Sequence, residues 1–401
     1  MSHRPPSTTG TAAAPHYQRQ DLDKNGIADH FSTFPMHPLT WLGAYSPGGL
    51  ALPAAQPTAS QLYAPRGVYL DDHVLIVADS GNHRVLIWHG VPTHDQQPAD
   101  VVLGQPDFTS EGAQAGGRGP ENGLYLPTAV TLIANQLYIA DAWNHRILIW
   151  NKVPQHSFVP PDRMLGQADL TQVSENRGGE ASGTTLYWPY SLAWIAGWFY
   201  IADTGNRRVL GWKGVPENDQ SPDLLLGQDD LHYRFENRGG AVAANTFRWP
   251  HAIAGNEDVL YVADAGNHRL LGWSPRAEAD RTADLVLGQP DFTQAQEWPY
   301  SKQSAQKLRF PYSASMDGGR LAVADTANNR VLFWHDPPQS GIYHAANAVL
   351  GQPDFESNGE NRWKMVERDT LCWPYGIHLH GNRLAVADSG NNRVMIWGNE
   401  T

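Results

Sequence analysis

Short apolar runs on either side of a polar turn recur six times along the chain. The first copy spans residues 77–88, and every copy reads apolar-Ala-Asp-x-x-Asn-x-Arg followed by an apolar stretch that closes on Trp. The aspartates are spaced 61 to 63 residues apart, at Asp79, Asp141, Asp203, Asp264, Asp325 and Asp388. Such a period indicates repeated structural units. Strand-forming residues around a turn of Gly, Asn and Asp predict that each copy is a β-hairpin.

Two further apolar segments accompany each hairpin. Upstream, a proline opens a short strand-like run, as in Pro189-Tyr190-Ser191-Leu192, and proline is tolerated at the first residue of a strand. Downstream of five hairpins stands Leu-Gly-Gln, first at residues 103–105. Four strands in each of six units predict an all-β fold, a six-bladed β-propeller with four-stranded blades. We name the strands of a blade A to D in chain order.

The last blade lacks its own fourth strand in this pattern. The sixth hairpin ends at Trp397, four residues before the end of the sequence, and no Leu-Gly-Gln follows it. Near the other end, Leu42-Gly43 is a degenerate copy of the missing segment. We therefore expect an N-terminal strand within residues 39–45 to complete the last blade, which would cover an otherwise open sheet edge.

The Asp-x-x-Asn-x-Arg hairpins resemble NHL repeats. Three of them also keep an Asn-His pair, at Asn82-His83, Asn144-His145 and Asn267-His268. The resemblance extends over about residues 39–397, although the units are longer than is usual for NHL repeats. It implies a propeller that acts as a binding scaffold. It also implies an alternative, because NHL-like lyases that amidate peptides and related propeller lactonases hold a catalytic metal on the channel axis.

The composition narrows the choice of partners. Forty-one Asp and Glu against 29 Lys and Arg give a net charge of −12, which disfavours binding to nucleic acid or to anionic membranes. The sequence has no apolar segment of signal-peptide or membrane-spanning length, so we expect no membrane insertion. The predicted location is cytoplasmic, or extracytoplasmic if a signal has been removed. Cys372 is the single cysteine, so no internal disulfide forms.

We divide the chain into an N-terminal tail, residues 1–38, and the propeller, residues 39–401. Within the tail, four oxygen-bearing residues fall at positions 1, 3, 5 and 9 of a calcium loop: Asp21, Asp23, Asn25 and Asp29. Gly26 falls at the sharp turn, but Ser32 replaces the bidentate Glu of position 12. The segment is therefore either a calcium site of reduced affinity or a solvated acidic turn.

The residue after each strand-A proline varies from blade to blade. Around the ring it is Arg66, Thr128, Tyr190, His251, Tyr312 and Tyr375, and the residue after it is always Gly, Ala or Ser. Strand directions place these residues at the top mouth of the channel, on the face shared by the B–C turns and the D–A loops. Convergent polar groups among aromatic rings are typical of a ligand site, which makes five of them ligand-binding candidates: Arg66, Tyr190, His251, Tyr312 and Tyr375. The alternative is that the rings only cap the channel and pack on one another.

The motifs that repeat in every blade favour structure over chemistry. A catalytic site needs one asymmetric group of residues, whereas a fold needs the same brace six times, so we interpret the Asp–Arg pairs as structural. The same argument covers the acidic residue after each strand D and the Glu-Asn-Arg segments of the D–A loops, which we expect to be braced by ion pairs or capping. His83, His145 and His268 are turn residues, replaced in other blades by Arg or Asn.

Two functions remain after these arguments. The first is a scaffold that binds a protein partner or a small ligand through its top face. The second is a metal-assisted lyase or hydrolase with its site at the top mouth of the channel. Only His251 and His378 offer metal ligands there, and no acidic ring occurs at the strand-A starts, so we prefer the scaffold. No catalytic residue and no oligomeric state follow from the sequence.

Overall fold

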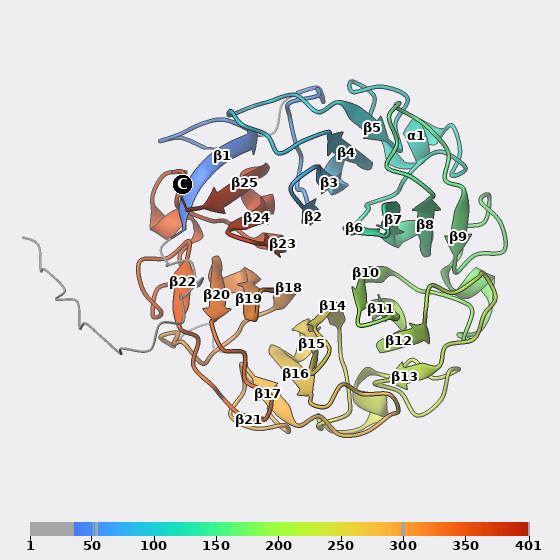
Figure 1. The fold of residues 1–401 in the computed structure, drawn as a ribbon, viewed down its shortest axis with the longest axis vertical. Coiled ribbons are helices and arrows are strands. Elements are labelled where there is room, and N and C mark those ends of the chain that lie inside the picture. The colour runs from blue at the N-terminus through green and yellow to red at the C-terminus, as the bar shows by residue number, and fades with distance from the viewer. Residues whose placement is uncertain (1–35, 51, 53–54, 298–300, 400–401) are drawn as a thin grey trace, which may run out of the picture. The chain divides into compact units, whose positions relative to one another are not determined.

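A computed structural model describes residues 36–399 except residues 51, 53–54 and 298–300. Its strands form six sheets, antiparallel except for one short added strand, arranged around a central channel (Figure 1). The predicted six-bladed β-propeller is therefore confirmed. The calcium-type loop at residues 21–32 lies outside the described residues.

The first three blades follow one another along the chain with strands A to D in order from the channel outwards. Blade 1 contains β2 (Gly67–Leu70), β3 (Leu75–Asp79), β4 (Arg84–Trp88) and β5 (Val101–Leu103). Blade 2 contains β6 (Ala129–Ile133), β7 (Gln136–Asp141), β8 (Arg146–Trp150) and β9 (Arg163–Leu165). Blade 3 contains β10 (Pro189–Ile195), β11 (Trp198–Asp203), β12 (Arg208–Lys213) and β13 (Leu224–Leu226).

The next two blades keep this plan with one addition. Blade 4 contains β14 (Pro250–Gly255), β15 (Leu260–Asp264), β16 (Arg269–Trp273) and β17 (Leu285–Leu287). Blade 5 contains β18 (Pro311–Asp317), β19 (Arg320–Asp325), β20 (Arg330–Trp334) and β22 (Ala348–Leu350). The short β21 (Gly341–Ile342), from the C–D connection of blade 5, pairs in parallel with β17 and extends blade 4.

The sixth blade joins the two ends of the propeller. It contains β23 (Pro374–His380), β24 (Arg383–Asp388), β25 (Arg393–Gly398) and, as its outer strand, β1 (His37–Gly43). β1 runs antiparallel to β25 with Leu42 opposite Val394, and the two strands lie side by side in Figure 1. Trp41 of β1 is fully buried beneath the Arg393 guanidinium, 4.1 Å from the ring centre. The predicted closure of the last blade by an N-terminal strand is confirmed.

The remaining helical elements are single turns. One 3₁₀ turn connects strands B and C in each blade: η1 (Ser80–Asn82), η2 (Ala142–Asn144), η4 (Thr204–Asn206), η6 (Ala265–Asn267), η7 (Thr326–Asn328) and η9 (Ser389–Asn391). Four more short elements lie in D–A loops: α1 (Ala113–Gly117), η3 (Glu175–Gly178), η5 (Glu236–Gly239) and η8 (Glu360–Trp363). No helix among the described residues has the length and apolar character needed to cross a membrane.

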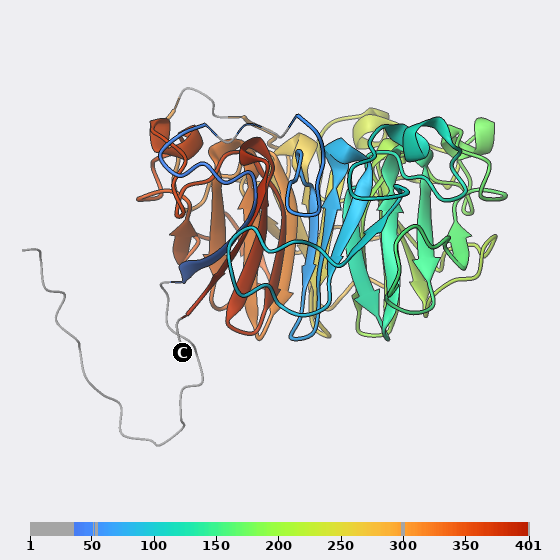
Figure 2. The same ribbon diagram turned by 90° about the horizontal axis from the view of Figure 1, so that it is seen from above.

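The hydrophobic core lies between neighbouring sheets rather than at the channel. Blades 1 and 2, for example, bury Ile76, Val85, Ile139 and Leu148 in one shared cluster. Strands B and C are therefore apolar on both faces, because each sheet packs against two others. The opposite ends of the strands form two distinct faces, which Figure 2 shows from the side.

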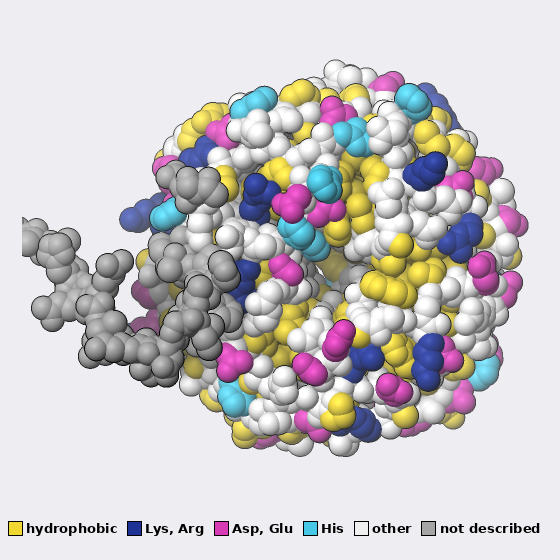
Figure 3. Space-filling view, in the orientation of Figure 1, with side chains coloured by type: hydrophobic (Ala, Val, Ile, Leu, Met, Phe, Trp, Pro, Cys, Tyr) yellow, Lys and Arg dark blue, Asp and Glu magenta, His cyan; other side chains and the backbone are white. Residues whose placement is uncertain are grey.

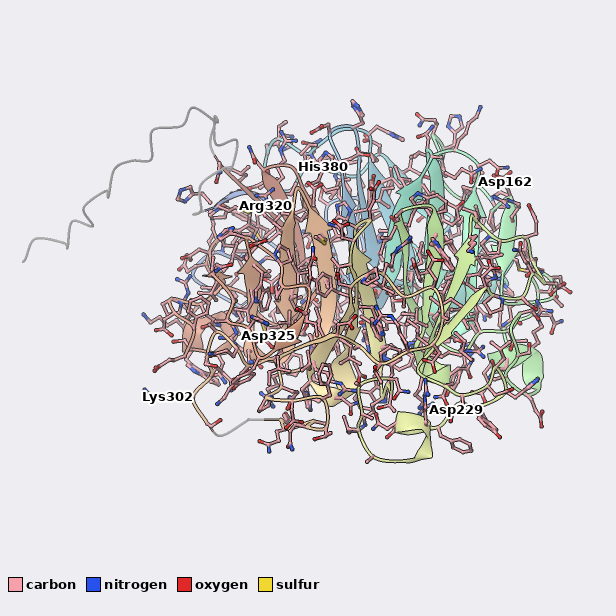
Figure 4. All side chains as sticks on the ribbon, turned by 60° about the horizontal axis from the view of Figure 1, so that its bottom comes forward. Asp162, Asp229, Lys302, Arg320, Asp325 and His380 are labelled. Carbon is pink, nitrogen blue, oxygen red and sulfur yellow. The ribbon has the colours of Figure 1, made fainter. Side chains whose placement is uncertain are left out.

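We call the end that carries the B–C turns and D–A loops the top face. Asp325 lies at this end of blade 5, whereas Arg320 and His380 lie at the opposite, bottom end of their blades (Figure 4). Figure 3 views the bottom face, where histidine and acidic side chains gather beside a central hollow. There, Asp72 pairs with His380 and Arg383, at 3.4 Å each.

Candidate functional site

The central channel encloses a cavity of about 200 Å³. All six residues that follow the strand-A prolines line it, so five blades bring together the five predicted ligand-binding residues. We call these six residues the mouth ring: Arg66, Thr128, Tyr190, His251, Tyr312 and Tyr375. The second ring, of Gly, Ala and Ser, also lines the cavity.

A β-bulge explains why four of the mouth-ring side chains reach the channel. In blade 3, Pro189 lies opposite Asp203 and Ser191 lies opposite Ala202, so Tyr190 has no residue opposite it. The same register shift frees His251, Tyr312 and Tyr375 in blades 4, 5 and 6. A bulged residue is released from strand pairing and its side chain can be redirected. In blades 3 to 6 the local backbone thus directs one mouth-ring side chain per blade to the channel mouth.

The second ring is small because neighbouring A strands approach closely. A Cβ atom added to Gly67 would lie 2.6 Å from the Thr128 carbonyl oxygen of the next blade. At Gly376 the corresponding distance to the Arg66 carbonyl oxygen is 2.1 Å. Both distances are well inside van der Waals contact, so larger residues at these two positions would push blades apart.

The mouth-ring aromatic groups form a continuous series of contacts across the mouth. Tyr190 and His251 have ring centres 4.1 Å apart, and His251 stacks on Tyr312 at 4.5 Å with an angle of 9° between the ring planes. Tyr312 then meets Tyr375 at 4.9 Å, and the Arg66 guanidinium lies 5.0 Å from the Tyr375 ring centre. The rings therefore pack on one another, as the alternative interpretation expected, and they also line the cavity.

Burial favours the neutral forms of His251, Tyr190 and Tyr312. It lowers the pKa of His251 to about 4, with a smaller contribution from the Arg66 charge. His251 Nδ1 lies 2.9 Å from the Trp249 carbonyl oxygen, so Nδ1 carries the hydrogen and Nε2 carries the lone pair. Burial also raises the pKa of Tyr312 to about 12. At neutral pH the ring thus offers one cation, Arg66, and hydroxyl groups that can donate hydrogen bonds.

One of these hydroxyls is unsatisfied. Tyr190 is 3% exposed, and its Oη has no hydrogen-bond partner among the described residues. Burial raises the pKa of Tyr190, the charge of Arg66 and the approach of its guanidinium to the hydroxyl oppose that rise, and the hydroxyls of Tyr375 and Tyr312 add to it. The guanidinium is close to Tyr190 Oη but makes no hydrogen bond to it within 3.5 Å, and all four polar groups line the same cavity. A buried hydroxyl without a partner costs free energy unless something supplies one.

The repeated Asp–Arg pairs hold the D–A loops against the hairpins. Asp79 Oδ2 accepts hydrogen bonds from Arg84 Nε at 2.7 Å and Asn82 Nδ2 at 2.9 Å, while Oδ1 accepts one from the Tyr63 backbone N–H at 2.7 Å. The guanidinium also donates to the carbonyls of Thr58 and Phe108, in the loops on either side of the blade. All six pairs are fully buried. Each Asp–Arg pair braces its own blade, so none of these six carboxylates is free to act in catalysis.

A family model described as NHL repeat matches residues 62–88, which carry strands A to C of blade 1 with their brace. Blade 1 therefore carries an NHL repeat, within a chain that forms a six-bladed β-propeller. The other five blades repeat the hairpin and brace that this match contains.

Several solved structures are similar to this chain at low sequence identity. The WD40 propeller domain of Doa1 is 12% identical with a TM-score of 0.45, over 90% of this chain and 98% of that one. A protein from Bacteroides thetaiotaomicron is 11% identical with a TM-score of 0.48, over 90% and 75%. Virginiamycin B lyase from Staphylococcus aureus is 10% identical with a TM-score of 0.42, over 86% and 98%. No curated protein matches the sequence.

The turn residue after each NHL asparagine has a role that the sequence did not reveal. In blade 2, His145 Nδ1 accepts a hydrogen bond from the Trp188 backbone N–H of blade 3 at 3.0 Å. Four other blades make the equivalent bond to the next blade, two through His Nδ1 and two through Asn Oδ1: His83 to Leu126, His268 to Phe310, Asn329 to Trp373 and Asn392 to Ala64. We call these five side chains the inter-blade acceptors.

Each inter-blade acceptor fixes the backbone two residues before a mouth-ring side chain. The five donor residues all have positive φ, from 45° to 51°, immediately before the strand-A proline. Such backbone conformations are strained for residues other than glycine. The exception is informative: Arg207 offers no acceptor, and the Trp249 N–H instead bonds Asp264 Oδ1 at 3.2 Å. The signal in the sequence was the restriction of this position to His or Asn in five blades.

The Glu-Asn-Arg segments brace the loops through their asparagines. Asn176 and Asn206 form a reciprocal amide pair at 2.9 and 3.0 Å. Asn361 forms the same pair with the hairpin asparagine of its blade, Asn391. Ion pairs of the Glu residues are longer and exposed, as at Glu175 and Arg234, 3.5 Å apart. The arginines of these segments form shorter ion pairs, such as Arg362 with Asp369 at 2.7 Å. The expected bracing is therefore present, in both amide pairs and ion pairs.

The donor set of the channel does not fit a metal. No group of three or more His, Cys, Asp or Glu side chains suited to a metal ion occurs in the described part of the chain. His251 and His378 line the cavity, and no Asp or Glu lines it with them. A catalytic zinc site ordinarily needs three protein ligands, so we derive no metal-dependent step here.

Proposed function

We propose that this NHL-repeat propeller is a binding protein whose top face receives a ligand, or one group of a protein partner, in the mouth of the channel. One observation carries the proposal. Five blades direct one Arg, one His and three Tyr side chains at a single cavity, and one of these, Tyr190, buries a hydroxyl that makes no hydrogen bond within 3.5 Å to any described residue. Variation at a position that every blade could fill alike favours recognition over bracing.

The surroundings of the mouth support the same proposal. Exposed aromatic and apolar side chains lie on the D–A loops of the top face, among them Tyr233, Phe235, Trp363 and Met365. Loops on a rigid scaffold are common positions for binding residues. A partner seated on these loops would present one of its groups to the mouth ring. The net charge of −12 disfavours nucleic acid as this partner.

The proposal is tested by asking whether ligands of any class bind at the mouth. Saturation-transfer NMR with a mixed fragment set, half of it uncharged, would compare the native protein with Tyr312→Ala. This change removes the ring that stacks on His251. We expect a subset of fragments to lose binding in Tyr312→Ala and to keep it in His380→Ala, a control on the bottom face. Fragment binding that is identical in all three proteins would contradict the proposal, provided that Tyr312→Ala melts cooperatively.

A further inference from the structure

The mouth of the channel holds an uncompensated positive charge in an acidic protein. Of the described residues that line the cavity, Arg66 alone is charged at neutral pH, since burial lowers the pKa of both His251 and His378 to about 4. No Asp or Glu lines the cavity, and no ion pair within the described residues includes Arg66. Its guanidinium instead lies over the Tyr375 ring. The cavity is therefore electrostatically suited to an anion.

The hydrogen-bonding groups around Arg66 are donors. Tyr190 Oη is buried without a partner, and so is the Oγ of Ser191, the next residue of the same strand. Both residues line the cavity. A hydroxyl can donate to an oxygen of a bound anion without carrying charge itself. A guanidinium and two hydroxyls that line one cavity form a donor set that matches the oxygens of a carboxylate.

Charge and size select among anions. A phosphate carries close to two negative charges at neutral pH, whereas Arg66 compensates only one. A carboxylate carries one charge and two coplanar oxygens, which a guanidinium can bind in a bidentate manner. The cavity of about 200 Å³ has the volume of roughly seven water molecules at ~30 Å³ each. The stacked His251 and Tyr312 rings add apolar walls for a flat or aliphatic body.

We propose that the mouth of the channel binds a carboxylate group, with Arg66 pairing the anion, the Tyr190 and Ser191 hydroxyls donating to it, and the mouth-ring aromatic groups enclosing the attached apolar body. The carboxylate belongs either to a small organic acid or to the C-terminus of a peptide, since both present the same monoanion. This inference rests on the proposed function, because it names the chemistry of what the top face receives.

The first experiment measures binding of benzoate and of benzamide, its uncharged analogue, by isothermal titration calorimetry. We expect benzoate to bind at least tenfold more tightly than benzamide. Arg66→Gln should weaken benzoate binding at least tenfold and Arg66→Lys less, because Lys keeps the charge but loses the bidentate fork. Arg383→Gln, which removes one positive charge from the bottom face, should leave benzoate binding unchanged. Equal binding of benzoate and benzamide, or no effect of Arg66→Gln, would overturn the inference.

Tyr190→Phe separates recognition from folding. The hydroxyl that it removes bonds no described residue, so the melting temperature should stay the same or rise. Benzoate affinity should nevertheless fall several-fold, since a donor to the anion is lost. A lower melting temperature together with unchanged benzoate affinity would assign the hydroxyl to the fold and overturn its role in binding.

Two further probes identify the source and the class of the anion. The peptide Gly-Gly-Phe with a free C-terminus should compete with benzoate if the mouth reads chain ends, and its C-terminal amide should not. Competition by benzoate alone points to a small acid, and either result supports the carboxylate. Inorganic phosphate binding more tightly than benzoate would overturn the monoanion assignment. If uncharged fragments bind at Tyr312 and no carboxylate binds, this inference is refuted and the proposed function stands. If no probe of either kind binds at Tyr312, both are refuted.

Discussion

Replacing His268 by asparagine should make the propeller less sensitive to acid. His268 is 4% exposed, and its Nδ1 accepts a hydrogen bond from the Phe310 N–H of the next blade at 3.2 Å. That bond requires the neutral imidazole, because protonated histidine has no lone pair to accept with. The chain itself supplies the design of the variant. Asn329 and Asn392 make the same bond from the same left-handed backbone conformation and do not titrate.

The expected size of the effect follows from the pKa shift. Burial lowers the pKa of His268 from 6.5 to about 4, while Glu297 opposes the shift and Arg248 and Arg309 add to it. Between these two values the unfolded chain is protonated and the folded protein is not, so stability is complete above pH 6.5 and falls as the pH drops towards 4. The loss that this one residue causes is about 2 kcal/mol at pH 5 and about 3 kcal/mol at pH 4.

The assay is urea unfolding at pH 7 and pH 5 for the native protein, His268→Asn and His268→Ala. Native protein and His268→Asn should have similar stability at pH 7, and the asparagine variant should be the more stable at pH 5 by about 2 kcal/mol. His268→Ala should be less stable at both values, since it leaves the Phe310 N–H unpaired, a loss of roughly 1–3 kcal/mol. Equal pH dependence in the native protein and His268→Asn would refute the reasoning.

Two other perturbations address the ends of the propeller and its tail. Deleting residues 1–45 should promote association and lower the free energy of unfolding by at least the ~3–5 kcal/mol that loss of the buried Trp41 costs, whereas deleting residues 1–20 should do neither. Size-exclusion chromatography and thermal melting measure both effects. A stable, monomeric fragment of residues 46–401 would contradict the closure of the last blade by β1. If Asp21 and Asp23 help to hold calcium, EGTA should accelerate proteolysis within residues 20–35. The double change Asp21→Ala, Asp23→Ala should abolish this sensitivity to EGTA. Equal digestion with and without calcium would favour a solvated turn.

The parts of the fold that the sequence predicts are those encoded within one repeat. Each NHL hairpin carries its strands, its turn and both partners of its ion pair within about a dozen residues, so six copies define six blades. The closure strand was also predictable, because Leu42-Gly43 matches a segment that is missing from one repeat and present in five. These predictions needed only local pattern and the requirement that no sheet edge remain open.

Interactions that reach beyond a single hairpin were not predictable in the same way. The bond from His145 to Trp188 spans 43 residues, and the pair of Asn176 and Asn206 spans 30. A repeat shows that such positions are restricted, but not to what they bond. The bulges were hidden for a related reason, since register depends on how strands A and B pair rather than on the sequence of either one. The position of Tyr190 in the ring was therefore predictable, whereas its unpartnered hydroxyl was not.

The inter-blade acceptors and the bulges together explain how one fold can keep its blades alike and its mouth varied. An acceptor on one blade holds the residue before the next proline in a strained conformation, and the bulge then releases the following side chain from strand pairing. Neither device depends on what that side chain is. Substitutions at the mouth ring such as Tyr312→Phe should thus change what the channel receives while the backbone that presents it stays in place, a separation that favours changes of specificity on an unchanged scaffold.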